Sequence, residues 1–359
     1  MKKQSFFAVA LILFLLTGCK SNDTYTEVTV LPTLPILETS APISSSEIPS
    51  DPGAEHGEVD AGSLGYGFGD RESPHIYTGE ELRLAFELEE TGKHAKNGTG
   101  ILLFLDGRPQ PYKTSEDDTY RYMHVFAPEE GQTQTDFDGE LVFMPITGKN
   151  GEALELNAIN ISFPDFSYQK DQNTGFKFTF GAVGDSSIIQ FEADAESQNT
   201  QALPVRSGLS NVQIFQEDVK LEDIFDWSEM DLEEKIEDHF WVNGMIDTGP
   251  ENVYGVTSES EIHLRYEVYG TPYVDFGLTL FVENQPLAVD ESCMIPISIE
   301  RGKKTVVEAT LTIPDFDGEA PIYAILSPKN SLLNEHFNIA GIDASRTFIL
   351  IAGEDPSKS

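Results

Sequence analysis

The strongest constraint on the fold is an alternation of apolar and polar residues that occurs twice along the chain. Within "ELRLAFELE", apolar residues alternate with polar ones from Leu82 to Leu88, and "EIHLRYEVYG" repeats the pattern from Ile262. Successive side chains of a β-strand point to opposite faces, so a period of two places all the apolar residues on one face. The two segments therefore predict half-buried strands rather than helices.

A second pair of matching segments follows the first pair. "GILLFLDGRPQPY" begins at Gly100 and "GLTLFVENQPLAV" begins at Gly277, and each runs from an apolar stretch through a polar turn to a proline. Asp106 and Gly107 suit a tight hairpin because both residue types tolerate positive φ. The two matches together predict two tandem domains built on one plan.

The other apolar segments are short and are separated by turn residues, with little sign of helix. This pattern predicts an all-β fold with two tandem immunoglobulin-like antiparallel β-sandwich domains, over residues 62–205 and 241–355. Residues 206–240 between them form an acidic connector, whose apolar spacing suits one or two helical turns. We expect Trp227 and Trp241 to pin this connector to the domains, the alternative being an exposed aromatic patch.

The first residues resemble an export signal. Lys2 and Lys3 precede an apolar run, Phe6 to Leu16, that is shorter than the roughly 20 residues needed to cross a bilayer. The run ends in "LTGC", which resembles the lipobox of bacterial lipoproteins. The resemblance implies removal of residues 1–18 and attachment of lipid to Cys19, hence a protein anchored to the extracytoplasmic face of the cell membrane. A plain secretory signal with an incidental cysteine is the alternative.

Residues 19–61 are rich in Pro, Ser, Thr and acidic residues and show no strand or helix period, so they predict a disordered tether. Beyond the tether, "ILLFLDGRPQPY" and "ELVFMPITGKNGEALEL" resemble uncharacterised two-domain β-sandwich surface lipoproteins of bacteria. That resemblance covers about residues 80–160 and implies location and architecture only.

The composition limits the kinds of partner. The chain has 61 acidic and 23 basic residues and a formal net charge of −38, which opposes binding to nucleic acid. The expected partners are the membrane, through lipidated Cys19, and a protein or glycan that the sequence does not identify. Cys293 is expected to be a small buried apolar side chain.

No pattern of residues predicts a catalytic centre, a metal site or a cofactor. The pentapeptide "DFDGE" occurs at Asp136 and again at Asp315, but it supplies only part of a calcium loop. We interpret both copies as turns, at different positions in the two domains. The seven histidines lack metal-ligand spacing, and no nucleophile or zinc-protease motif is present.

The sequence therefore predicts a non-enzymatic, lipid-anchored surface protein that binds a partner or takes part in an envelope assembly. One alternative is a cell-envelope hydrolase with a site at the domain junction, where His239 would meet several carboxylates. Another is a solute-binding lipoprotein, although such proteins normally alternate strands with helices of 10–15 residues.

Overall fold

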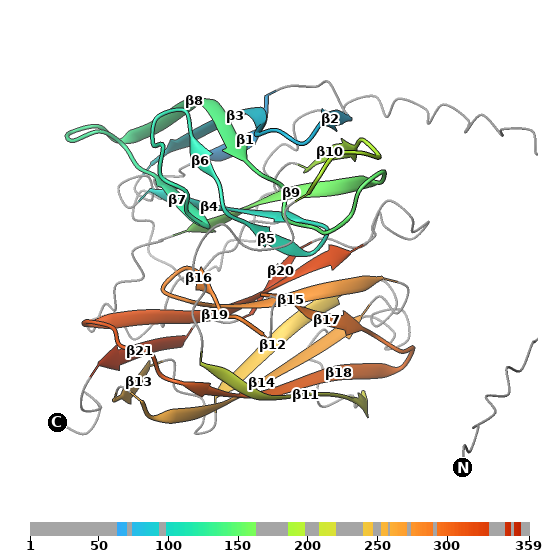
Figure 1. The fold of residues 1–359 in the computed structure, drawn as a ribbon. Coiled ribbons are helices and arrows are strands. Elements are labelled where there is room, and N and C mark those ends of the chain that lie inside the picture. Colours follow the sequence, from blue (N-terminus) through green and yellow to red (C-terminus); the bar gives the residue numbers. More distant parts are fainter. Residues whose placement is uncertain are drawn as a thin grey trace, which may run out of the picture. The chain divides into compact units, whose positions relative to one another are not determined.

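The computed structural model describes residues 63–69, 74–92, 98–162, 186–197, 208–219, 240–246, 253–257, 259–270, 274–289, 293–329, 342–345 and 348–352. The predicted signal peptide, Cys19 and the tether lie outside these residues, as does the part of the connector from 220 to 239. Every regular element in the described residues is a β-strand (Figure 1).

The first sandwich consists of two sheets. Its outer sheet has the order β1-β3-β8-β6, formed by β1 (Leu64–Phe68), β3 (Leu82–Thr91), β8 (Gln134–Phe143) and β6 (Lys113–Thr114). Its inner sheet has the order β2-β10-β9-β4-β5, with β7 also paired to β4. These strands are β2 (His75–Tyr77), β10 (Ser186–Phe191), β9 (Ala153–Ser162), β4 (Thr99–Leu105), β5 (Arg108–Gln110) and β7 (Met123–Phe126).

The second sandwich repeats this arrangement. Its outer sheet has the order β11-β18-β14-β12, formed by β11 (Leu209–Asp218), β18 (Lys303–Thr312), β14 (Glu261–Gly270) and β12 (Phe240–Ile246). Its inner sheet has the order β13-β21-β19-β15-β16, with β17 on β15 and β20 on β19. These are β13 (Val253–Val256), β21 (Phe348–Ala352), β19 (Glu319–Lys329), β15 (Asp275–Val282), β16 (Gln285–Pro286), β17 (Ile295–Ser298) and β20 (Asp343–Ala344).

These strand orders confirm the predicted fold class. In an immunoglobulin domain, strands A, B, E and D form one sheet and strands G, F and C the other. The order β1-β3-β8-β6 corresponds to A-B-E-D, and β10-β9-β4 corresponds to G-F-C. In both sandwiches the remaining edge strand runs parallel to its neighbour, β2 beside β10 and β13 beside β21.

The internal repeat is visible in the equivalent hairpins. The β4–β5 turn has positive φ at Asp106 (51°) and Gly107 (79°), and the β15–β16 turn has positive φ at Glu283 (49°) and Asn284 (61°). Positive φ at both central residues is the geometry of the type I′ hairpin turn, whose twist matches that of the flanking strands. The predicted match between the two segments is therefore confirmed in backbone detail.

Each sandwich encloses its own apolar core. In β3, buried residues alternate with exposed ones as the sequence pattern requires, and Phe86 is fully buried in the first core. Tyr266 takes the corresponding position on β14 in the second core. Cys293 is buried, as expected from the sequence.

A third apolar cluster joins the two inner sheets. Phe104 of β4 packs edge-on against Phe281 of β15, with ring centroids 6.3 Å apart, and Phe281 stacks on Tyr323 of β19 at 5.1 Å. The backbones also approach closely, because a Cβ on Gly107 would lie 3.2 Å from the amide nitrogen of Gly277. Both faces of β4 are consequently buried.

The interpretation of "DFDGE" as a turn is wrong for its first copy. Asp136 to Glu140 lie inside β8, because Phe137 faces the core while the aspartates on either side of it are exposed. Gly139 leaves room for the ring of Phe137, since an added Cβ would lie 3.1 Å from the ring carbon Cε2. The second copy does form the bend between β18 and β19, with φ of 75° at Gly318. The two copies occupy different positions in the two sandwiches, as expected.

The range 206–240 needs a correction at its start. Residues Leu209–Asp218 form strand β11, which pairs with β18 and so belongs to the outer sheet of the second sandwich. The apolar residues of this segment do not alternate regularly, but β18 offers it a ladder of hydrogen-bonding groups that only one bulge, between Ser210 and Gln213, interrupts. The predicted helical turns lie in the part of the connector outside the described residues.

Candidate functional site

The one site residue predicted from the sequence, Cys19, lies outside the described residues, so lipid attachment stays a prediction. No helix in the described part of the chain is long and apolar enough to cross a membrane. His239, the histidine of the alternative junction site, is also outside the described residues.

The described histidines and acidic residues are not arranged as a metal centre. No group of three or more His, Cys, Asp or Glu side chains in the described ranges could hold an ion. His124 is buried in the first sandwich, where its Nε2 lies 2.8 Å from the carbonyl oxygen of Tyr112. Burial lowers the pKa of His124, because an apolar environment disfavours the charged ring.

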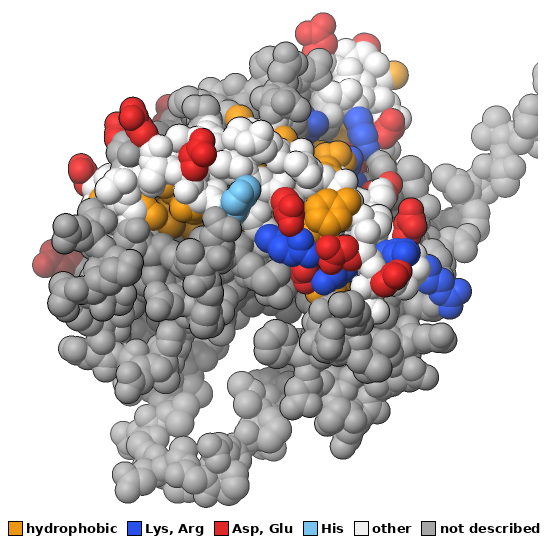
Figure 2. Space-filling model, turned by 90° about the horizontal axis from the view of Figure 1, so that it is seen from below, with side chains coloured by type: hydrophobic (Ala, Val, Ile, Leu, Met, Phe, Trp, Pro, Cys, Tyr) orange, Lys and Arg blue, Asp and Glu red, His pale blue; other side chains and the backbone are white. Residues whose placement is uncertain are grey.

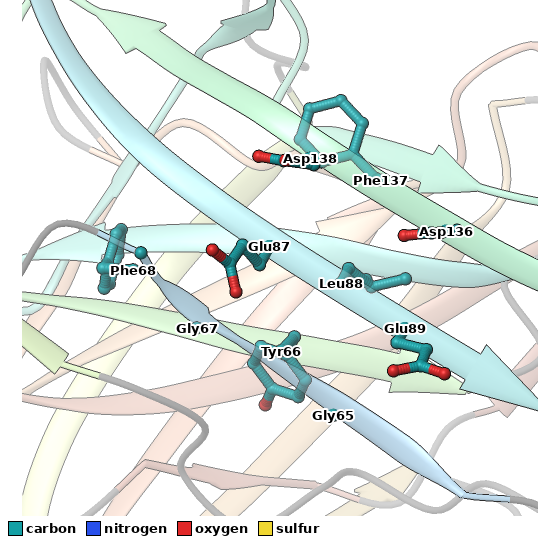
Figure 3. A pocket seen from close by; sticks show the side chains of 11 residues that line it. Gly65, Tyr66, Gly67, Phe68, Glu87, Leu88, Glu89, Asp136, Phe137 and Asp138 are labelled. Atoms are coloured by element: carbon teal, nitrogen blue, oxygen red, sulfur yellow. The ribbon is translucent and has the colours of Figure 1, made fainter.

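The candidate site is an open groove on the outer sheet of the first sandwich. The groove has a volume of about 520 Å³ and is lined by residues of β1, β3 and β8. Figure 3 shows its charged side chains, which are Glu87 and Glu89 from β3 and Asp136 and Asp138 from β8. We call these four residues the acidic face.

The register of β3 and β8 brings the four carboxylates together. Glu87 lies directly opposite Asp138, and Glu89 lies directly opposite Asp136. Directly opposed side chains on an antiparallel pair have Cβ atoms about 4.5–5.5 Å apart, and like charges in these positions are destabilising. The sheet thus carries an electrostatic cost that a cationic ligand would relieve.

Within the described residues, no lysine or arginine forms an ion pair with the acidic face. Among the described side chains, Gln134 Nε2 donates a hydrogen bond of 3.1 Å to Glu89 Oε1. The nearest described cation on these strands, Arg83, pairs instead with Glu140 at 3.0 Å and with Glu81 at 3.6 Å. The four carboxylates therefore present net negative charge to solvent.

Strand β1 forms the side of the groove with little side-chain bulk. Tyr66 and Phe68 turn toward the core, where both rings contact Phe86. Gly65 and Gly67, which alternate with these two residues along β1, face outward. A Cβ added to Gly65 would meet no atom within 4 Å. The glycines leave open space beside the acidic face.

The outer sheet of the second sandwich has a different surface, in which acids and bases are paired. Arg265 of β14 bonds to Glu308 at 2.6 Å, to Glu217 at 3.0 Å and to Glu267 at 2.8 Å. Lys304 of β18 lies 3.0 Å from Glu267 and 3.4 Å from Glu217. Figure 2 shows acidic and basic side chains lying next to one another on this side of the protein.

These contacts shift the pKa values of Glu267 and Arg265, the pair at the centre of the network. Burial raises the pKa of Glu267, but hydrogen bonds from Tyr269, Arg265 and Lys304 outweigh burial and hold the pKa below its ordinary value. Burial lowers the pKa of Arg265, and its three carboxylate partners more than reverse that effect. Both shifts favour the charged forms of Glu267 and Arg265.

Sequence reasoning missed the acidic face. The signal was present as acidic residues two positions apart, Glu87 with Glu89 and Asp136 with Asp138, inside segments of alternating burial. Reading it would have required the register of β3 against β8, which one sequence does not show. Gly65 and Gly67 lie in β1, and Gly69 forms the bend after it.

Comparisons with known proteins assign the chain to no family. No family model matches the chain, and no curated protein matches it in sequence. Solved structures that match include the fibronectin(III)-like modules of Clostridium thermocellum CbhA, with 9% identity over 82% of this chain and 94% of that chain and a TM-score of 0.19.

Two other matches are of the same kind. The C-terminal domain of the Streptococcus pyogenes antigen I/II-family protein AspA is 8% identical over 80% of this chain and 99% of that chain, with a TM-score of 0.20. The tandem V-type regions of the chitin-binding protein VCBP3 are 9% identical over 80% and 99%, also with a TM-score of 0.20. Values this low support no inference about function.

Proposed function

We propose that the chain is a lipid-anchored protein of the extracytoplasmic membrane face, and that its two sandwiches form a non-enzymatic binding or envelope-assembly module. The observation that carries the binding role is the open acidic face of the first sandwich, with no cation paired to it in the described residues. The anchor rests on the lipobox-like "LTGC" that ends at Cys19.

The alternative of a hydrolase at the junction is less well supported. The described contact between the sandwiches is built on packed aromatic and aliphatic side chains such as Phe104, Phe281 and Tyr323. A hydrolytic site needs carboxylates or histidines held at defined separations. A solute-binding lipoprotein of the usual kind is also disfavoured, because the described residues contain no alternation of strands and helices.

The anchor can be tested by fractionating cells that produce the full chain. We expect the wild-type protein in the membrane fraction and Cys19→Ala in the soluble extracytoplasmic fraction or the medium, because the alanine carries no lipid. Ser21→Ala is a matched control near the same cleavage site and should stay in the membrane. Membrane retention of Cys19→Ala would contradict lipid anchoring.

The binding role can be tested by cross-linking in intact cells. We expect the full wild-type chain to form a specific adduct with one envelope component. The double variant Glu87→Gln/Asp138→Asn should lose this adduct, because it neutralises an opposed pair on the acidic face. Glu300→Gln, on the second sandwich, is the control and should keep it. An adduct that persists in the double variant would move the binding site away from this face.

A further inference from the structure

The two outer sheets differ at one edge, where β6 lies beside β8 in the first sandwich and β11 lies beside β18 in the second. In the second sandwich, β11 covers the edge of β18 from Asp218, opposite Lys303, to Leu209, opposite Leu311. In the first sandwich, the equivalent strand β6 pairs only with Val142 and Leu141 of β8. Strand β11 precedes all the other strands of its sandwich in the chain, so it is an added strand and not a part of the immunoglobulin order.

Within the part of the chain that the structure describes, most of the β8 edge is consequently without a paired strand. Ser115 N donates a hydrogen bond to the carbonyl oxygen of Glu140, and Glu140 N donates one to Ser115 Oγ, so the backbone groups of Glu140 point away from β3. Alternate residues of an antiparallel strand point their backbone groups in the same direction. The N–H and C=O groups of Asp138, Asp136 and Gln134 therefore also point outward, and no described strand pairs with them.

Among the described residues, this edge lacks the usual protection against strand addition. Natural edges are commonly blocked by proline, bulges, lysine or a covering segment. Strand β8 has no proline, and its register with β3 is continuous from Leu82, opposite Phe143, to Thr91, opposite Gln134. Its exposed charges are all negative, so they repel acidic strands and attract basic ones.

The added strand of the second sandwich shows how charge selects the occupant. There the sheet supplies the cations, and β11 brings Glu217 to Arg265 and Lys304 and Asp218 to Lys303. In the first sandwich the sheet supplies the carboxylates of the acidic face. By the same logic, its occupant must supply cations.

We propose that the open edge of β8 accepts an extended, basic segment of a partner protein as an added antiparallel strand. Its Lys or Arg side chains would lie at alternate positions over the acidic face. Its intervening apolar side chains would cover the rim of the core, as Leu209 and Val212 of β11 do in the second sandwich. Strand addition of this kind takes affinity from backbone hydrogen bonds and specificity from alternate side chains.

Other segments of this protein fit the edge less well. Pairing of β8 with β8 of a second copy would set Asp136 and Asp138 against the same residues. The tether, residues 19–61, contains Lys20 as its one basic residue and several prolines. The proposal rests on the binding role proposed above and names the site and the partner chemistry for it.

The test measures binding of the full chain to a blocked, labelled octapeptide of alternating Lys and Val by fluorescence anisotropy. Two control peptides are an alternating Glu and Val peptide and the Lys–Val peptide with every second backbone amide N-methylated. We expect the Lys–Val peptide to bind at least tenfold more tightly than either control. Hydrogen exchange should slow at Asp136 and Asp138 on binding.

Two variants test the edge itself. Asp136→Pro removes an outward N–H that is not part of the β3 ladder, so it should leave the fold intact and weaken peptide binding at least tenfold. The charge-reversal variant Asp136→Lys/Asp138→Lys keeps the backbone donors. It should bind the Glu–Val peptide more tightly than the Lys–Val peptide. Circular dichroism and thermal melting check the fold of each variant.

Three results would overturn the proposal. One is equal binding of the methylated and unmethylated peptides, which would indicate simple adsorption to the acidic face. Another is unchanged preference in the charge-reversal variant. The third is a wild-type dimer that Asp136→Pro dissociates, which would make a second copy the occupant. If these results appear while the cross-linked adduct still depends on the acidic face, the edge inference fails and the binding role stands. If the peptide binds but no adduct forms, the binding role fails.

Discussion

The outer sheets of the two sandwiches share one topology and differ in how their surface charges are satisfied. Glu267 on β14 and Glu87 on β3 occupy corresponding positions in the repeat. Glu267 is buried among Arg265, Lys304 and Tyr269, whereas Glu87 is exposed on the groove opposite Asp138. The comparison shows that the repeated plan fixes where strands lie, while the edge position and its charges decide what the surface can bind.

The inner sheets of the two sandwiches pack against each other, and the largest expected effect tests this contact. Phe281→Ala should lower the free energy of unfolding by about 3–5 kcal/mol, because it opens a cavity among Phe104, Tyr323 and their neighbours. Hydrogen exchange should report the loss in strands of both sandwiches. The control Val125→Ala alters an exposed side chain and should change stability by less than about 0.5 kcal/mol. A loss confined to the second sandwich would show that the inner sheets are not coupled.

The next effect distinguishes the ion pairs around Glu267 from the carboxylates of the acidic face. Glu267→Gln should cost about 2–3 kcal/mol, because it removes the closer of the two carboxylates that buried Lys304 contacts. The matched change Glu87→Gln should cost nothing or stabilise slightly, since it removes a like-charge contact. Urea denaturation of both variants measures the difference. Equal losses would contradict the distinction between the two sheets.

A smaller effect depends on pH and belongs to the first sandwich alone. Because burial lowers the pKa of His124, the unfolded chain binds a proton more readily than the folded chain as pH falls below about 6.5. Stability should therefore be complete above this pH and fall by about 1 kcal/mol on acidification, with Asp117, whose Oδ2 lies 3.9 Å from Nδ1, limiting the loss. Thermal melting from pH 7 to pH 5 measures the fall.

In His124→Gln this part of the pH dependence should disappear, whereas His263→Gln in the second sandwich should retain it. A His124→Gln protein that loses stability with pH as steeply as the wild type would contradict the assignment to His124.

The smallest effect compares the two copies of "DFDGE". Asp138→Asn should stabilise the protein by about 0.5 kcal/mol at low salt, because Asp138 opposes Glu87 within a sheet. Asp317→Asn, the corresponding residue of the second copy, lies in an exposed bend and should have no measurable effect. Melting temperatures with and without 0.5 M NaCl (about a threefold shorter screening distance than at low salt) check the electrostatic origin. A gain in stability of Asp138→Asn that persists at high salt would exclude an electrostatic origin.

The sequence predicted the parts of the fold that local patterns specify. Alternation at Leu82 to Leu88 and from Ile262 located β3 and β14, and positive-φ residues located the β4–β5 hairpin. The sequence did not predict β11, because the apolar residues of Leu209–Asp218 do not alternate regularly. The strand depends on pairing with β18, which is distant in the chain. The acidic face was not predicted for a similar reason, since it depends on the register between β3 and β8.

Strand β11 has a consequence for how two copies of this protein would behave at high local concentration. It precedes every other strand of its sandwich, and residues 220–239 separate it from β12 along the chain. A neighbouring molecule's β11 carries the same Glu217 and Asp218 and would meet the same Arg265, Lys304 and Lys303. Two copies at close distance would therefore exchange this strand without losing the ion pairs of Glu217 and Asp218, and the second sandwich would be the place at which domain-swapped pairs form.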